Sequence, residues 1–146
     1  MTDSSGRGFT LVEIAVVILL LGMMFAFAVP AFRNISNTYQ LKGATQNIAA
    51  QLRLAREKAI ATGASQTMHF TLNFPAGTDY DYHIHNGATV GPSWALPRGI
   101  SYYSVGVNPV MSADGRSDAS GNIILQDQKG HRDTVSVQLS GLVLTK

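Results

Sequence analysis

The sequence contains no cysteine, which excludes disulfide bridges, a thiol nucleophile and any metal or iron–sulfur site held by cysteine. Charge is also scarce, because only 14% of the 146 residues are Asp, Glu, Lys or Arg and the formal net charge is +2. A surface that follows nucleic-acid phosphates needs a stronger basic excess. Phosphate-cradling glycine loops, G-x-S-x-G elbows and H-E-x-x-H helices are absent too, so we expect neither an enzyme nor a cofactor.

The apolar residues are concentrated near the N-terminus. Between Phe9 and Phe32, 20 of 24 residues are apolar, whereas the other 122 residues contain 46. As a helix this segment is about 36 Å long, enough to cross a hydrocarbon core of roughly 30 Å. We therefore expect residues 9–32 to form a transmembrane helix, followed in the sequence by one small domain.

Glu13 is an exception within this apolar segment. A carboxylate in a transmembrane helix costs on the order of 2.5–3.5 kcal/mol, so it needs a partner. Cleavage after Gly8 would create an amine on Phe9, one helical turn before Glu13, and this amine or that of a neighbouring chain could neutralise the carboxylate. The alternative is that Glu13 reaches the membrane interface, because it lies near the end of the segment.

The order of these residues resembles the class III signal of type IV pilins and type II secretion pseudopilins. Gly8-Phe9-Thr10-Leu11-Val12-Glu13 is followed by the apolar run and then by Pro30, which should kink the helix. The resemblance implies that a prepilin peptidase removes residues 1–8 and that Phe9 is N-methylated. It also implies subunit docking by Glu13 and a single-pass location in the bacterial inner membrane, with the C-terminal domain in the periplasm.

After Pro30 the pattern becomes amphipathic. Apolar residues recur at three- and four-residue spacing, so we expect the helix to continue over residues 33–63 and to stop at Gly63. The residues of this stripe are Leu41, Ala44, Ile48, Leu52, Ala55 and Ala59. The basic cluster at 53–58 could contact nucleic acid or acidic lipid, but a solvated helical face with an Arg53–Glu57 pair is the stronger interpretation.

From residue 64 onward apolar and polar residues alternate, which is the period of two that is typical of β-strands. Met68, Phe70, Leu72 and Phe74 alternate with polar residues, and a turn follows at 75–78. Tyr80, Tyr82 and Ile84 then alternate with polar residues up to Asn86-Gly87, and further strands are predicted at 100–107, 123–125, 134–139 and 142–144. We expect residues 64–146 to form an antiparallel β-sheet packed on the helix, which is an α+β fold.

This body resembles the H-type pseudopilins and their FimT-like minor pilin relatives. The matching stretches are residues 47–67, 96–100, 112–117, 135–137 and 140–141. The resemblance implies a minor pseudopilin of a type II secretion system, assembled with other pseudopilins or pilins into a filament; the alternative is a FimT-like minor type IV pilin that primes pilus assembly. DNA binding at a pilus tip is disfavoured, because Gly141 is followed by Leu142, Val143 and Leu144 rather than by arginines.

Polar residues on the predicted β-hairpin are candidate metal ligands. If Phe74 pairs with Tyr80, then His69 lies opposite His85 and four candidates share one face of the sheet. These candidates are His69, His83, His85 and Asp81. They could hold zinc or copper, but a polar sheet face commonly carries such residues, so we expect no metal.

The segment Asp114-Gly115-Arg116-Ser117-Asp118 contains the residue types of a calcium loop. It does not have the ligand spacing or the terminal Glu of an EF-hand. Because Asp and Gly also favour tight turns, we interpret this segment as a turn.

Overall fold

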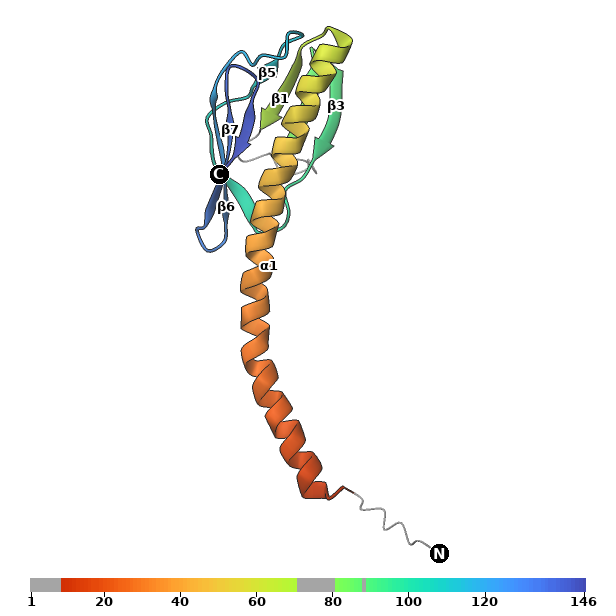
Figure 1. Cartoon of the computed structure of the whole chain (residues 1–146), viewed down its shortest axis with the longest axis vertical. Coiled ribbons are helices and arrows are strands. Elements are labelled where there is room, and N and C mark those ends of the chain that lie inside the picture. Colours follow the sequence, from red (N-terminus) through yellow and green to blue (C-terminus); the bar gives the residue numbers. More distant parts are fainter. Residues whose placement is uncertain (1–8, 71–80, 88) are drawn as a thin grey trace, which may run out of the picture. The chain divides into compact units, whose positions relative to one another are not determined.

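The computed structural model describes residues 9–70, 81–87 and 89–146 (Figure 1). One helix, α1 (Leu11–Thr62), and eight strands occur within these residues. The strands are β1 (Gln66–Phe70), β2 (Tyr82–Asn86), β3 (Thr89–Trp94), β4 (Ile100–Val105), β5 (Val110–Met111), β6 (Gly121–Asp127), β7 (Arg132–Val137) and β8 (Val143–Thr145). The chain consists of two compact units, Met1–Ser36 and Asn37–Lys146, and every strand belongs to the second.

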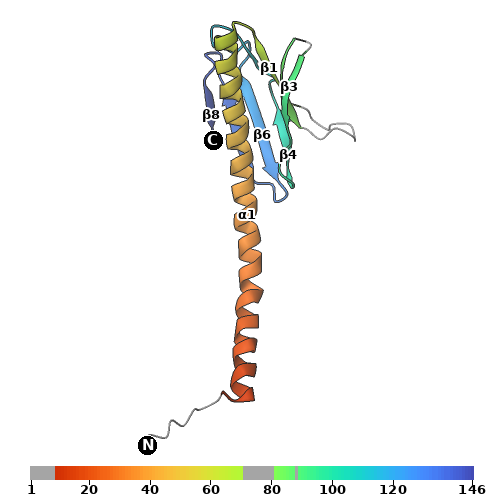
Figure 2. The same cartoon turned by 90° about the vertical axis from the view of Figure 1, so that its right-hand side faces the viewer.

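The described strands form two antiparallel sheets rather than the single sheet that we expected. One sheet has the order β3-β2-β1-β5 and the other the order β4-β6-β7-β8. In Figure 2 the C-terminal turns of α1 lie over β6, with β8 to one side and β1 and β3 to the other. The predicted α+β class with antiparallel strands on a helix is confirmed.

The amphipathic half of α1 forms the centre of the core of the second unit. The six residues of the predicted stripe, Leu41 to Ala59, are each at most 5% exposed. They form one apolar cluster with residues of both sheets, among them Met68 and Ile84 from the first and Ile123 and Val135 from the second. The helix is therefore the layer that both sheets share. It ends where predicted, because Gly63 has a φ of +67° that suits a helix C-terminus.

The first hairpin has the predicted faces but not the predicted register. Met68, Tyr82 and Ile84 are buried while the alternating residues are half-buried. His69 pairs with His83, not with His85, so the register differs by two residues from our expectation. Alternation specifies which face a residue occupies, and a shift of two residues preserves that face. The expected Phe74–Tyr80 pair and the turn at 75–78 lie outside the described residues.

Two strands, β3 and β5, were missed from the sequence. β3 contains Gly91 and Pro92, which are ordinarily depleted in strands. It is an edge strand, where the missing N–H of proline is tolerated. A Cβ at Gly91 would lie 2.8 Å from the carbonyl oxygen of Ile84, so only glycine fits beside this irregular part of β2. β5 has only two residues, Val110 and Met111, too few to show a period.

The shared core predicts a position-specific loss of stability. Leu52 is fully buried in α1, whereas Leu54, two residues later, is 50% exposed. We expect Leu52→Ala to lower the free energy of unfolding by about 2–5 kcal/mol. Leu54→Ala, the matched control, should change it by less than about 0.5 kcal/mol. Urea unfolding of the full chain in detergent, followed by the fluorescence of Trp94, measures both; equal losses would contradict the packing.

Candidate functional site

The helix begins next to the predicted cleavage point. Thr10 precedes α1, and its carbonyl oxygen and its Oγ1 both accept from the backbone N–H of Glu13, at 3.1 and 3.2 Å. Thr10 is therefore an N-cap, and Glu13 lies in the first turn, where the helix dipole favours a carboxylate. Gly8 lies outside the described residues. Cleavage, methylation and docking at Gly8, Phe9 and Glu13 remain predictions.

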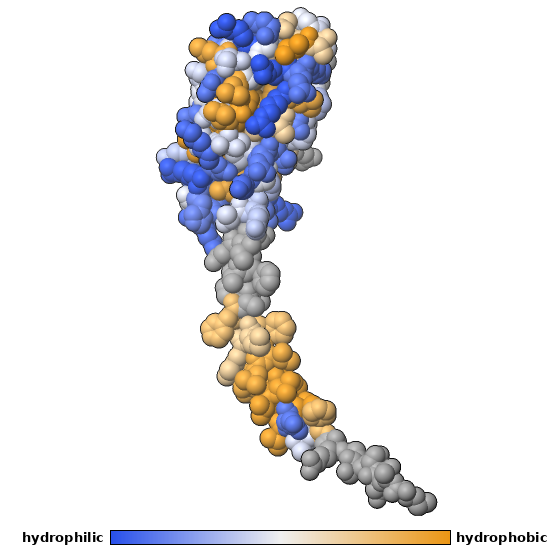
Figure 3. Space-filling model, in the orientation of Figure 1, coloured by the Kyte–Doolittle hydropathy of each residue, from blue (hydrophilic) through white to orange (hydrophobic). Residues whose placement is uncertain are grey.

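The first unit exposes a large apolar surface. Fourteen large apolar side chains between Phe9 and Phe27 are 46% to 86% exposed. Figure 3 shows this segment as an almost continuous hydrophobic surface. Soluble monomers rarely expose an apolar surface of this extent, so it is the strongest candidate for an interaction surface in the described part of the chain.

The predicted transmembrane helix and the predicted kink are not settled by the structure. Within the residues that it describes, no helix is both long enough and apolar enough to cross a membrane. α1 runs through Pro30 without interruption. The transmembrane role of residues 9–32 and the kink at Pro30 stay predictions.

The three candidate histidines of the first sheet do come together. The ring centres of His69 and His83 are 5.3 Å apart, those of His83 and His85 5.6 Å, and those of His69 and His85 6.4 Å. Partial burial, and then repulsion by the other two imidazoles, holds the pKa of His83 below its ordinary value. The fourth candidate, Asp81, accepts a hydrogen bond of 2.6 Å from the backbone N–H of Leu96. It therefore anchors the segment after β3.

The basic face of α1 is less solvated than expected. Arg53 donates to the carbonyl oxygen of Val143 at 3.0 Å, and the Nε of Arg56 donates to the carbonyl oxygen of Gly115 at 2.7 Å. Both arginines border a cavity of about 200 Å³ together with Glu57 and residues 141–143. They thus tie the helix to β8 and to the 114–118 turn. Sequence spacing could not reveal these contacts, because their acceptors lie 90 and 59 residues further along the chain.

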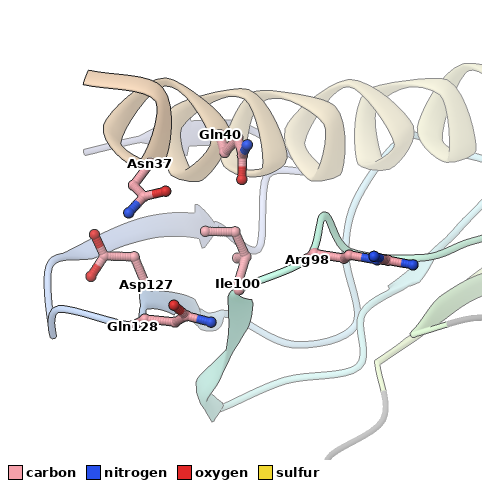
Figure 4. A pocket seen from close by; sticks show the side chains of 7 residues that line it. Asn37, Gln40, Arg98, Ile100, Asp127 and Gln128 are labelled. Atoms are coloured by element: carbon pink, nitrogen blue, oxygen red, sulfur yellow. The ribbon is translucent and has the colours of Figure 1, made fainter. Parts of the chain in front are cut away.

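A second cavity, of about 100 Å³, lies between α1 and the second sheet and is lined mainly by polar side chains (Figure 4). Asp127 is almost fully buried there, and its carboxylate accepts from the backbone N–H groups of Lys129 and His131 and from His131 Nδ1. The His131 side-chain hydrogen bond lowers the pKa of Asp127. Arg98 points away from this carboxylate in Figure 4. The cavity is smaller than the roughly 300 Å³ of ordinary ligand sites, so we interpret it as a packing feature.

The 114–118 segment is a turn, as the sequence indicates. Asp114 Oδ1 accepts from the backbone N–H of Arg116 at 3.1 Å, and Asp118 Oδ1 accepts from that of Val110 at 2.8 Å. Gly115 has a φ of +78°, which glycine adopts readily. Both carboxylates therefore stabilise local backbone structure.

Comparisons with known proteins relate the chain to pilus and secretion subunits. No family model matches it. Two fimbrial proteins of Pseudomonas aeruginosa are each 32% identical to it over 75 residues, which are 51% of this chain and 46% of theirs. The chain thus spans about half the length of the curated relatives it matches. The solved structure of the minor pseudopilin EpsH from the type 2 secretion system of Vibrio cholerae covers 73% of this chain and 96% of its own, with a TM-score of 0.56 and 13% identity.

These similarities confirm the resemblance to the type IV pilin and pseudopilin family that the N-terminal motif carries. The likeness to EpsH agrees with the resemblance to H-type pseudopilins, and at 13% identity it shows a shared fold. The α+β arrangement of one long helix and antiparallel strands is therefore pilin-like.

The close approach of Gly141 to the 114–118 turn predicts that alanine at position 141 destabilises the fold. Gly141 and Gly130 both have a left-handed φ, of +75° and +84°, so alanine costs about 1–2 kcal/mol at either position. A Cβ at Gly141 would also collide with the carbonyl oxygen of Gly115, whereas a Cβ at Gly130 meets open space. We expect Gly141→Ala to cost about 1–3 kcal/mol more than Gly130→Ala in urea unfolding. Equal costs would show that the collision is relieved.

Proposed function

We propose that the chain is an H-type minor pseudopilin of a type II secretion system, which assembles into or caps the periplasmic pseudopilus that drives protein export. The observation that carries this proposal is the contrast within α1. Its first part exposes thirteen large apolar side chains between Leu11 and Phe27, and one face of its last part is buried under two sheets. A chain built in this way has a folded body and a separate apolar segment that requires another environment.

In this proposal residues 1–8 are a leader that a prepilin peptidase removes, and residues 9–32 then hold the subunit in the lipid of the inner membrane. Residues 33–63 and 64–146 form the periplasmic body. On assembly the apolar segments of several pseudopilins pack together in the filament core. Burial of each large apolar side chain contributes about 1.5–3 kcal/mol relative to exposure in water, so lipid or neighbouring subunits must cover this segment.

Glu13 supplies specificity in this packing. In an apolar surrounding its carboxylate requires a cationic partner. The N-terminal amine of Phe9, in the same or a neighbouring subunit, is the group of opposite charge that cleavage would create. Matching the two groups would fix the axial position of one subunit against the next.

A second candidate is a FimT-like minor type IV pilin that primes pilus assembly. The similarity to fimbrial proteins of Pseudomonas aeruginosa favours this alternative. DNA binding at a pilus tip has weaker support, since half-exposed Leu142 and Leu144 follow Gly141 where arginines would be needed. Neighbouring genes for a secretion ATPase and an outer-membrane secretin would favour secretion, and neighbouring pilus genes would favour the alternative.

Processing of the N-terminus is directly measurable. We expect intact-mass spectrometry of the protein extracted from membranes to give a chain that starts at Phe9 and carries one added methyl group. A Gly8→Ala variant should retain residues 1–8, because it alters the predicted cleavage site. An unprocessed Met1 start in the unaltered protein would refute the predicted cleavage after Gly8 and the methylation of Phe9.

The docking role of Glu13 can be separated from its place in the helix cap. Glu13→Gln keeps the backbone N–H that Thr10 binds and removes only the charge. We expect unchanged membrane insertion and at least about a tenfold loss of incorporation into filaments, which corresponds to 1.4 kcal/mol. Glu57→Gln, on an exposed part of the body, is the matched control. Normal incorporation of Glu13→Gln, measured by immunoblotting of sheared filaments, would remove the docking role.

A further inference from the structure

The histidine cluster on β1 and β2 is not accounted for by the proposed pilin-like assembly. His69 and His83 are direct cross-strand partners, and His85 follows His83 on the same face of β2. All three side chains are half-buried on this face. The remaining histidine, His131, lies between β6 and β7 in the other sheet and contacts Asp127.

The separations of the three rings are somewhat larger than those of imidazoles that share one metal ion. Zinc–nitrogen distances of about 2.0–2.1 Å place the centres of two rings on one tetrahedral ion roughly 5 Å apart. The observed separations are 5.3, 5.6 and 6.4 Å. Strand pairing thus brings the imidazoles within a small adjustment of shared coordination.

The hydrogen bonds of the rings fit a ligand role. His85 Nδ1 lies 3.1 Å from the carbonyl oxygen of Gly87, which can only accept; the neutral imidazole that donates this bond from Nδ1 has its lone pair on Nε2. A backbone carbonyl orients many metal-bound histidines in this way. His69 Nδ1 is buried and, among the described residues, has no hydrogen-bond partner. A buried polar atom of this kind calls for a water or an ion as its partner.

The surroundings tolerate an added cation. Thr67 pairs with His85 and Ser93 pairs with His83, and neither carries a charge. The charged group nearest in sequence is Asp81, two residues before His83, and its carboxylate accepts from the backbone N–H of Leu96. In the present side-chain conformations no three His, Asp or Glu groups of the described residues are placed to hold a metal. Binding therefore requires the imidazoles to turn about their side-chain bonds while the strand pairing stays unchanged.

We propose that His69, His83 and His85 together bind one late first-row divalent transition-metal ion, of the class of Zn²⁺ or Cu²⁺, with water completing the coordination. Imidazole suits these ions. Bound metal would cross-link β1 to β2. This proposal departs from the sequence-based expectation of no metal, and it is independent of the filament in which the chain assembles.

The untagged full chain in detergent can be dialysed against Zn²⁺ at pH 7.5 and its metal content measured by mass spectrometry. We expect one zinc per chain. His83→Gln and His85→Gln should each weaken binding at least about tenfold, and His131→Gln, the control, should leave it unchanged. Zinc binding that survives the triple replacement of His69, His83 and His85, or that is lost with His131→Gln, would overturn the site.

A second measurement tests the site in the unaltered protein, so that its result does not depend on whether the histidine variants fold. Cu²⁺ added at one equivalent should give an electron paramagnetic resonance spectrum with hyperfine splitting from two or more imidazole nitrogens. Splitting from a single nitrogen, or a spectrum of free aqueous copper, would refute shared coordination by these histidines.

Discussion

The body depends on one constraint: a single helical face must cover two sheets at once. Ile48 and Leu52 lie at the centre of that face and are fully buried. The alanines around them are small enough for strands of both sheets to approach the helix. Arg53 and Arg56 flank this stripe and bond carbonyl groups of β8 and of the 114–118 turn. The same helix segment thus supplies the apolar contact and two of the polar ties that hold the C-terminal half of the chain.

The N-terminal part of the same helix has apolar side chains all round rather than on one face. Around Leu11–Phe27 apolar side chains occur on every side, and within the first unit they remain exposed. A helix that is hydrophobic all round belongs inside a larger assembly or a membrane. The core of the second unit consists of residues from Leu41 onward. One chain thus combines a folded domain with a separate, exposed apolar surface.

The periodicity of the sequence correctly predicted which faces of the helix and strands are buried, but it did not predict how the strands pair. The three- and four-residue spacing from Leu41 to Ala59 identified six buried positions, because a helix repeats every 3.6 residues whatever it packs against. It did not identify Thr45 and Ala49, which are also fully buried. The alternation around Met68 and Ile84 identified the buried faces of β1 and β2. It misplaced their register, since a two-residue shift leaves each residue on the same face and only the connecting turn and the partner strands select among such shifts. β3 was missed because Gly91 and Pro92 fit only an irregular edge strand.

Local chemistry was therefore sufficient for the long helix, its apolar and amphipathic halves, its stop at Gly63 and the α+β class, because each depends on contacts within a few residues. The N-terminal motif was likewise readable without coordinates. The division into two sheets, the pairing of His69 with His83 and the bonds from Arg53 and Arg56 depend on residues that meet across long stretches of chain. No local pattern encodes those meetings. They follow from the free energy of the whole packed core, in which both sheets pack against the same face of α1.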